Sequence, residues 1–444
     1  MNNYTRRSGG SSRLFATASQ PQLHLQAVNQ RLQNSVSRLA EETAALVGVR
    51  ECLRWFSSEK AWVLDQQVRL CRIPAPTFFE QERARWMAAR FKELGCEVRL
   101  DGAGNVLAFP RKAAGEPYIV LSAHLDTVLA PRTPEDIVAE AGGRLRGPGV
   151  SDNGAGLAAL LAVAAALWES PALPDLHCGL LLLANVGEEG EGNLSGTRYF
   201  CHESAAGSLA RAFVVLDGPA TDHITTTALE SRRFEVIVTG NGGHSWSDFG
   251  MGNPLHALIR SMSLFIAEAP GIDSATGRNS FNVGVVEGGA SVNAIPSLAR
   301  AKVDLRSETS AGVAQLVKCL TAAVERGVEM ENAAARTGRV FAETRLIGSR
   351  PGGRLADSAP VLQALLAVDS YLGVRSRLDC ASTDANIPLS MGKQAVSIGA
   401  GGTGGGSHTA SEWYHPAGRD LGLKRVFLTL AMLLRDPELA QDAT

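Results

Sequence analysis

Two spacings of apolar residues alternate along the chain: continuous runs, which predict buried strands, and helical repeats, which predict packing helices. In the first half we expect strands at residues 98–100, 105–109, 118–123, 178–186 and 212–216, and helices at 80–94 and 156–167. Apolar strands that alternate with helices are typical of a parallel sheet covered on both faces. This part of the chain therefore predicts an α/β fold, with a mostly parallel sheet flanked by helices.

The pattern changes at about residue 225, where strand positions begin to alternate between apolar and polar. The expected order is strand, helix, strand, strand, helix, strand, at residues 233–239, 254–268, 280–287, 299–306, 311–326 and 340–347. This order predicts a small α+β domain of ferredoxin-like type with an antiparallel sheet. The α/β pattern then resumes, with helices at 359–372 and 421–434 and strands at 376–380 and 395–398. The small domain is therefore predicted to be an insertion.

These patterns place the domain boundaries. We expect an N-terminal extension at 1–45, a first part of the α/β domain at 46–222, the inserted domain at 223–347 and a second part of the α/β domain at 348–444. Residues 23–46 and 49–68 have helical spacing. The first 40 residues contain five arginines, many serines and no acid, a composition that resembles an organellar transit peptide. A disordered tail that leads into a helix is the preferred interpretation.

The amino-acid composition limits the kinds of partner that the protein is expected to bind. Lysine and arginine number 43 against 45 for aspartate and glutamate, so no basic surplus favours nucleic acid or an anionic membrane surface. The longest apolar run, residues 155–168, is too short to cross a bilayer. Seven scattered cysteines without a CxxC pair indicate reduced thiols, which favours a cytoplasmic location. A small-molecule substrate is the expectation.

Three groups of metal-ligand residues lie where strands or loops end: His124 with Asp126, then Asp152, then Glu188 with Glu189. Each group alone has an ordinary explanation, since His-x-Asp is frequent by chance, Ser-Asp-Asn before an apolar run caps a helix, and paired glutamates are usually solvated. Together they would meet at the carboxyl edge of one parallel sheet. So many carboxylates would repel one another or take up protons unless divalent cations neutralised them.

From residue 70 to the end, the chain resembles the M20 family of metallo-exopeptidases and amidohydrolases. Eight motifs stand in the order and spacing of that family: Ser122-Ala123-His124-Leu125-Asp126-Thr127, Gly149-Val150-Ser151-Asp152-Asn153, Gly187-Glu188-Glu189-Gly190, Leu216-Asp217-Gly218, Gly242-Gly243-His244-Ser245, Asn293-Ala294-Ile295-Pro296, Ser382-Thr383-Asp384-Ala385-Asn386 and Ser407-His408. The resemblance implies a zinc-exopeptidase-like fold in which the insertion is a dimerisation and lid domain. It also implies a homodimer.

The resemblance further implies two divalent ions, zinc first, with cobalt or manganese as alternatives. His124, Asp152 and Asp217 would hold one ion. Asp152, Glu189 and His408 would hold the other, so that Asp152 bridges the pair. Two metals about 3.5 to 4 Å apart require a shared ligand of this kind.

The same resemblance implies the remaining roles. Glu188 would be the general base, and Asp126 would orient the metal-binding imidazole two residues before it. His244 would enter the active site of the other subunit and stabilise the oxyanion. Asn293 and Arg306 match positions that grip the carboxylate or carbonyl of the substrate, although Arg306 could equally form a surface ion pair.

Three functions stay open on the sequence. The first is an exopeptidase that cleaves small peptides, and the second is an N-acyl-amino-acid amidohydrolase with the same hydrolytic chemistry. Asp217 favours the first, because the deacylase branches of the family resemble one another in having glutamate at that position. The third is an inactive binding protein with the M20 fold, which a missing ligand or base would have favoured.

Overall fold

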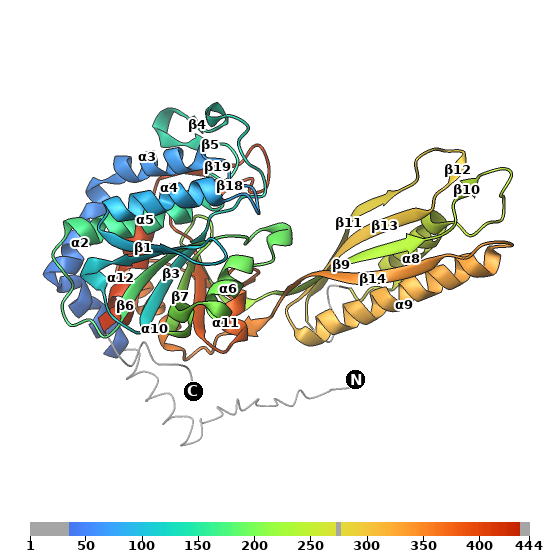
Figure 1. Ribbon diagram of the computed structural model, residues 1–444. Coiled ribbons are helices and arrows are strands. Elements are labelled where there is room, and N and C mark those ends of the chain that lie inside the picture. The colour runs from blue at the N-terminus through green and yellow to red at the C-terminus, as the bar shows by residue number, and fades with distance from the viewer. Residues whose placement is uncertain (1–34, 272–276, 436–444) are drawn as a thin grey trace, which may run out of the picture.

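The computed structural model describes residues 35–271 and 277–435 as two lobes (Figure 1). A compact α/β lobe contains both chain ends of this described part, and an elongated lobe projects from it. Most of the predicted N-terminal extension, residues 1–34, lies outside the described residues, whereas residues 35–45 are helical. No described helix combines the length and apolar character needed to cross a membrane.

The compact lobe is built on a nine-stranded sheet with the order β1-β2-β6-β3-β7-β17-β8-β15, and β16 pairs with β8. Its strands are β1 Cys96–Leu100, β2 Val106–Pro110, β3 Tyr118–His124, β6 Gly179–Asn185, β7 Ala210–Leu216, β8 His223–Ala228, β15 Gly353–Arg354, β16 Arg377–Ala381 and β17 Gln394–Ile398. Neighbours among β6, β3, β7 and β17 are parallel, while β1, β2 and β15 pair antiparallel toward the edges. The α/β prediction is therefore confirmed.

Helices pack around this sheet into one large hydrophobic core. They are α2 Val47–Ser58, α3 Lys60–Cys71, α4 Gln81–Glu93, α5 Gly154–Glu169, α6 Ser195–Glu203, α7 Ala205–Ser208, α10 Pro360–Leu372, α11 Asn386–Ser390 and α12 Arg419–Arg435. The helix expected over 49–68 is two helices, α2 and α3, which meet at Glu59. Both α2 and α3 pack on α5.

The projecting lobe is the inserted α+β unit. Its antiparallel sheet has the order β11-β13-β9-β14, with β9 Glu230–Thr239, β11 Asn279–Gly288, β13 Leu298–Ser307 and β14 Phe341–Arg350. Helices α8 (Pro254–Glu268) and α9 (Ser310–Ala334) pack against each other and against this sheet. Alternate residues of β9, such as Phe234, Val236 and Val238, enter a second hydrophobic core. Short strands β10 (Gly243–His244) and β12 (Ala294–Ile295) form its far end (Figure 1).

The predicted boundary at residue 223 falls inside the large sheet, because β8 pairs with β16 and β17. The sequence of β8 is rich in threonine, as in a half-exposed strand. These polar residues placed the predicted start of the insertion too early, within a strand that belongs to the first lobe. At the other end, β14 continues to Arg350, three residues beyond the predicted limit of 347. Strands β9 and β14 therefore form the connection between the lobes (Figure 1).

A small separate sheet lies beside the carboxyl edge of the large one. It has the order β18-β19-β5-β4, with β4 Val138–Ala139, β5 Leu145–Arg146, β18 Thr403–Gly405 and β19 Trp413–His415. Strand β19 pairs with β5, so the chain around residue 408 is fixed next to the turn around residue 150.

Candidate metal centre and active site

Strands of the large sheet end at side chains that can bind metal. His124 is the last residue of β3, Asp217 directly follows β7, and Glu188 and Glu189 lie shortly after the end of β6. Because β6, β3 and β7 are parallel neighbours, their carboxyl ends meet at one edge. Asp152 reaches the same edge from the turn that precedes α5.

Two positions in the turn before α5, Gly149 and Asn153, require particular residue types. Gly149 has a φ of +75°, and a Cβ at this position would lie 2.4 Å from Thr127 Cγ2. A glycine is therefore needed both for the backbone angle and for the close approach. Asn153 then caps α5, because its Oδ1 accepts a hydrogen bond from Gly156 N at 3.1 Å. Turn and cap together set the position of Asp152.

Five predicted metal ligands lie close together. His124 Nε2 is 3.1 Å from Asp152 Oδ1 and 4.0 Å from Asp217 Oδ1. His408 Nε2 is 3.2 Å from Asp152 Oδ2 and 2.9 Å from Glu189 Oε1. Each imidazole thus faces a different oxygen of Asp152. The geometry groups the side chains into two triads that share one carboxylate.

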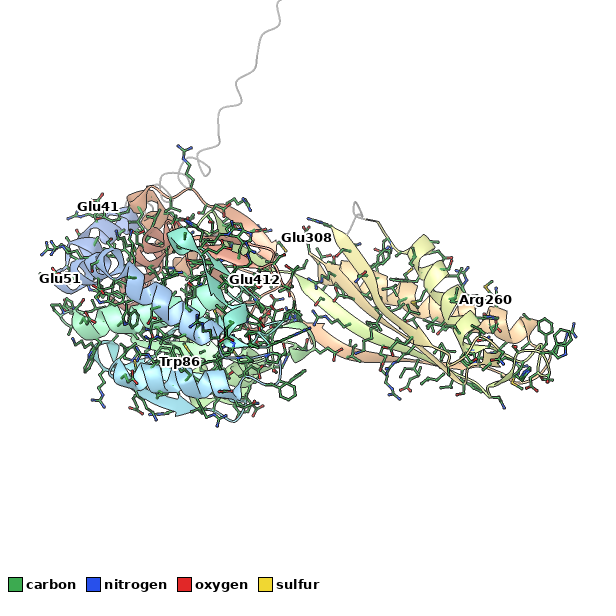
Figure 2. All side chains as sticks on the ribbon, turned by 90° about the horizontal axis from the view of Figure 1, so that it is seen from above. Glu41, Glu51, Trp86, Arg260, Glu308 and Glu412 are labelled. Carbon is green, nitrogen blue, oxygen red and sulfur yellow. The ribbon has the colours of Figure 1, made fainter. Side chains whose placement is uncertain are left out.

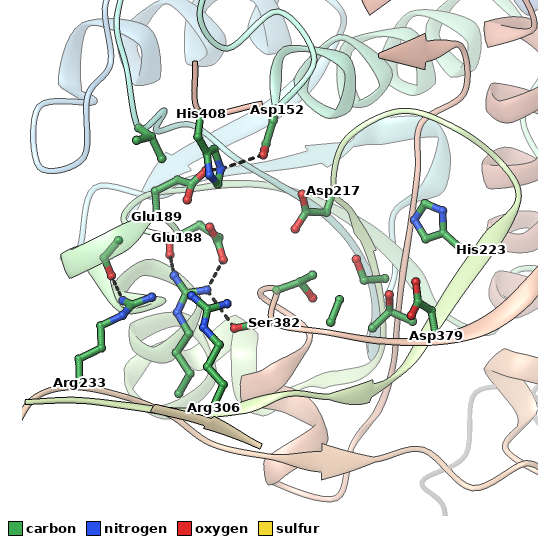
Figure 3. A pocket seen from close by; sticks show the side chains of 17 residues that line it. Asp152, Glu188, Glu189, Asp217, His223, Arg233, Arg306, Asp379, Ser382 and His408 are labelled. Atoms are coloured by element: carbon green, nitrogen blue, oxygen red, sulfur yellow. Dashed lines mark hydrogen bonds and ion pairs between the residues drawn. The ribbon is translucent and has the colours of Figure 1, made fainter. Parts of the chain in front are cut away.

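The two triads border a cavity of about 420 Å³ between the lobes (Figure 3). Its lining contains polar side chains from both lobes: Asp152, Glu188, Glu189, Asp217, His223, Thr225, Arg233, Arg306, Arg350, Asp379, Ser382, Thr383, Ser397 and His408. The cavity is large enough for a small ligand, and most of its specific contacts would be polar.

The charges in the cluster depend strongly on one another. Hydrogen bonds to Asp152 and Glu189 raise the pKa of His408 to about 10. Burial, together with the neighbouring Asp152 carboxylate, raises the pKa of Asp217 to about 7. Burial disfavours the charged form of His124, yet the surrounding carboxylates hold its pKa well above the usual value. Protons therefore compensate these carboxylates when no cation does so.

The donor set fits divalent cations. Each triad offers imidazole nitrogen and carboxylate oxygen and no thiolate, which is a common combination for zinc in hydrolytic sites and also suits other divalent ions. Metal ions would replace the protons that balance the cluster, since ligands must be deprotonated to bind. The residues present are therefore able to hold divalent metal.

Glu188 is buried beside the triads, with 4% of its surface exposed, and it forms a further close group with His124 and Glu189. Arg350 Nη1 donates to Glu188 Oε1 at 2.9 Å and to Ser382 Oγ at 3.1 Å, and Arg350 Nη2 donates to the carbonyl of Glu188. Burial raises the pKa of Glu188 well above its usual value, although the guanidinium of Arg350 acts in the opposite direction. A buried carboxyl in this position can accept a proton and return it.

Asp126 lies beside the cluster, and its contacts differ in one respect from the expected ones. His124 Nδ1 lies 2.9 Å from the backbone carbonyl of Asp126 and 3.6 Å from its carboxylate, so the carbonyl is the hydrogen-bond partner that sets the tautomer. The carboxylate instead accepts hydrogen bonds from Glu188 N and Glu189 N, each at 2.9 Å, and from Thr77 Oγ1. Asp126 thereby fixes the loop that carries the two glutamates.

Arg306 enters the cavity from the inserted lobe (Figure 3). Its Nε donates to Asp304 Oδ2 at 2.6 Å, while Arg233 Nε donates to Asp304 Oδ1 at 3.0 Å. Arg233 also donates to the carbonyl of Gly190, which follows the glutamate pair. Strands β9 and β13 thus place cationic side chains opposite the acidic cluster.

Two family profiles match the chain. That of Peptidase family M28 covers residues 105–237, and that of the M20 peptidase dimerisation domain covers residues 230–329. The second match coincides with the insertion in the large sheet. Both matches are to peptidase profiles, and together they support an M20-type metallopeptidase.

Relatives with assigned names fall into two groups. A probable carboxypeptidase of Aspergillus terreus is 31% identical over 217 residues, which is 46% of this chain and 47% of that protein. A succinyl-diaminopimelate desuccinylase of Corynebacterium glutamicum is 27% identical over 341 residues, which is 75% of this chain and 86% of that protein. The chain thus spans about half the length of the fungal carboxypeptidases that it matches.

Solved structures of peptidases share the fold over most of the chain. Aminopeptidase PepT of Bacillus cereus has a TM-score of 0.64 and 21% identity, with 84% of this chain and 98% of that chain covered. The dipeptidase Dug1p of Saccharomyces cerevisiae has a TM-score of 0.68 and 14% identity, with 88% of this chain and 100% of that chain covered. At this identity the likeness concerns the fold.

Two predicted M20 site residues, His244 and Asn293, lie at the far end of the insertion, away from the cavity of their own chain (Figure 1). Ser245 N donates to Asn293 O at 2.9 Å, which holds the two segments together. His244 Nδ1 accepts from the backbone N of Trp246 and of Ser247, so the ring hydrogen is on Nε2. A role in the site of a second subunit stays a prediction.

Arg350 is a site residue that the sequence analysis did not predict. It stands at the end of β14, directly before Pro351-Gly352-Gly353, where an arginine has no distinctive signal. Its contact with Glu188 joins residues 162 positions apart. The only signal in the sequence was its position near the end of the insertion. A side chain at the connection between two lobes can reach the space between them.

Proposed function

We propose that this chain is a divalent-metal-dependent exopeptidase that hydrolyses an amide bond of a small peptide. One observation carries the proposal: two His and carboxylate triads that share Asp152 lie in the same cavity as the buried Glu188. The carboxypeptidase relatives and the peptidase fold neighbours support the reaction class.

We infer that two ions bind, with zinc preferred and cobalt or manganese as alternatives. His124, Asp152 and Asp217 would hold one ion, and Asp152, Glu189 and His408 the other. When bound, such ions activate water and polarise a carbonyl group.

The residues of the chain then provide the proton transfers and the orientation. The carboxylate of Glu188 accepts a proton from the attacking water and later delivers it to the nitrogen of the leaving amine. Asp126 keeps this carboxylate in place through the backbone of the glutamate loop. Arg306 and Arg350 offer guanidinium groups that can bind an anionic end of the substrate. Because Arg350 donates a hydrogen bond to Glu188, binding of the substrate anion by Arg350 would replace that hydrogen bond at least in part.

A second copy of the chain completes the site in this proposal. His244 of that copy would donate its Nε2 hydrogen to the carbonyl oxygen on which negative charge develops. Asn293, held next to His244 by the β10–β12 pairing, would contact the same end of the substrate. The M20 dimerisation domain supports a homodimer.

An N-acyl-amino-acid amidohydrolase is the second candidate, and the desuccinylase relative favours it, since that similarity extends over three quarters of the chain. Asp217 favours the peptidase, because the resemblance associates aspartate at this position with the peptidase branches. An inactive protein with the M20 fold is the weakest candidate, because every predicted ligand and the base are present.

The test is a substrate panel with purified protein after chelation and after addition of zinc, cobalt or manganese. It compares dipeptides, tripeptides, acyl-amino acids and peptides blocked at either end. The proposal expects hydrolysis of free peptides that chelation removes and a divalent ion restores. Full activity in protein shown by elemental analysis to be metal-free would overturn it, and activity on acyl-amino acids alone would select the deacylase.

A further inference from the structure

Glu412 is a buried carboxylate beside the metal cluster, with 2% of its surface exposed. Its Oε1 accepts hydrogen bonds from Ser151 N at 2.7 Å and Asp152 N at 2.8 Å, and its Oε2 accepts one from Gly149 N at 2.8 Å. Three backbone donors from one short turn therefore converge on a single side chain. Hydrogen bonds to an ionised acceptor are short and strong, which suits these distances.

The backbone of Glu412 contacts the same turn. Gly147 N donates to the carbonyl of Glu412 at 2.9 Å, directly before the β19–β5 pairing begins. Glu412 thus holds the turn from both sides, through its side chain and through its main chain. Figure 2 shows the residue in the α/β lobe, on the side that faces the insertion.

Glu412 also lies four residues after His408. The segment that carries His408 and the turn that carries Asp152 are far apart in sequence. Nevertheless, His408 and Asp152 must come together to form a triad with Glu189. Glu412 is the residue that ties the one segment to the other. Its carboxylate contacts backbone N–H groups, and the two triads do not include it.

We propose that Glu412 is a positioning residue that presets the Asp152 turn relative to His408, so that both metal positions are formed before an ion arrives. The inference rests on the proposed metal dependence. Without the carboxylate, three buried N–H groups would lose their acceptor, and the turn would rearrange to satisfy them. Its negative charge also adds to the attraction for cations.

Asp126 provides an internal precedent for this role. Its carboxylate accepts hydrogen bonds from the backbone of Glu188 and Glu189, as that of Glu412 does from the turn around Asp152. The Asp152 turn and the glutamate loop are therefore each held by one buried acid. Residues that support ligands in this way typically contribute a factor of about 10 to 100 in metal affinity.

The test is the affinity of Glu412→Gln for zinc, measured by competition with a chromophoric chelator in protein whose fold is checked by circular dichroism. The amide keeps the size of the carboxylate but places an NH₂ group against backbone N–H donors. The expected result is zinc binding weaker by about 10- to 100-fold at equal folded content.

Glu331→Gln is the matched control. Glu331 is buried in the insertion, accepts Asn253 N at 3.0 Å and pairs with Arg260, which Figure 2 places far from Glu412. This change should lower stability and leave zinc affinity at the wild-type value. A purely structural loss at Glu412 would resemble this control.

Wild-type zinc affinity in folded Glu412→Gln would overturn the inference. If this variant fails to fold, hydrogen exchange in the wild-type protein gives the answer: the amides of Ser151 and Asp152 should be protected even without metal, and rapid exchange of these amides in metal-free protein would overturn the inference. A wild-type protein that binds no divalent ion would overturn the proposed function as well, so the two failures are distinguishable.

Discussion

The metal cluster contains a predicted metal-binding histidine and the tip of the insertion a predicted catalytic one, but the surroundings of the two are opposite. At the cluster, His124 is buried, and both the Asp152 turn and the glutamate loop are fixed by hydrogen bonds to buried acids. At the tip, His244 is exposed, and Trp246 and Phe249 beside it are 86% and 78% exposed. The cluster is assembled within one chain, whereas the tip has a formed hydrogen-bond donor that lies away from the cavity of its own chain.

This contrast indicates what each region needs. Buried carboxylates at short distance need cations, because proximity alone would only raise their pKa values. Exposed aromatic side chains around a polar group are typical of a surface that another molecule covers. A second subunit would cover the exposed side chains of the tip, and metal ions would neutralise the carboxylates of the cluster. The experiments that follow separate these two needs.

The largest expected effect is that of Asp152→Ala. This carboxylate faces both imidazoles, so its loss should remove metal from both positions and abolish activity. Elemental analysis of the purified variant measures the metal directly. Asp357→Ala, at an exposed acid, is the control and should keep wild-type metal and activity. Normal metal content in Asp152→Ala would show that the two triads do not share a ligand.

Glu188→Gln should lower kcat by about 10² to 10⁴ and leave the metal content unchanged, because the amide removes the proton acceptor and keeps the size. Activity and bound metal are measured on the same sample. Glu191→Gln is the matched control, since Glu191 lies on the same loop but is exposed and paired with Lys302. Loss of metal in Glu188→Gln, with full turnover per remaining ion, would exchange the roles assigned to Glu188 and Glu189.

His244→Ala addresses the tip and should lower kcat by about 10² to 10³ with metal intact, the usual loss for one oxyanion donor. If the histidine acts in the other subunit, mixing this variant with Glu188→Ala should restore activity. Random exchange makes half of the dimers hybrid, and one site of each hybrid has both residues, so about a quarter of all sites recover.

The control for this experiment is a mixture of Glu188→Ala with Glu188→Gln, in which no hybrid site is whole. Native mass spectrometry confirms that hybrid dimers are present. If they are present and the His244→Ala mixture stays at the average of its two parents, the histidine does not act across a dimer, and the contrast between cluster and tip has another cause.

Arg306→Gln should have the smallest effect. A hydrogen bond to a charged group contributes about 1.5 to 3 kcal/mol, so kcat/KM should fall by about 10- to 100-fold for peptides with a free carboxylate and little for their C-terminal amides. Arg345→Gln, at an exposed pair with Glu343 in the same lobe, is the control. An equal fall for acids and amides would assign Arg306 to the ion pair with Asp304.

The sequence by itself determined the elements of the fold and the side chains that gather in the cluster. Apolar runs locate the strands, and residues of metal-binding type follow directly after them at His124 and at the Glu188-Glu189 pair, whereas the role of Asp217 was implied by the resemblance to the M20 motifs. Helix α8 was predicted at the bounds observed, Pro254–Glu268. These features are local, because the pattern and the feature it predicts occupy the same stretch of chain.

Only the tertiary structure decided which distant residues hold that chemistry in place. Arg350 meets Glu188 across 162 positions, and Glu412 meets Asp152 across 260. The sequence around Arg350 or Glu412 does not indicate which residue it contacts, since an isolated charged residue in a loop is usually solvated. Such contacts arise when parallel strands and a lobe connection bring separate loops to one edge of the sheet, and there burial turns an ordinary carboxylate or guanidinium into a strong electrostatic partner.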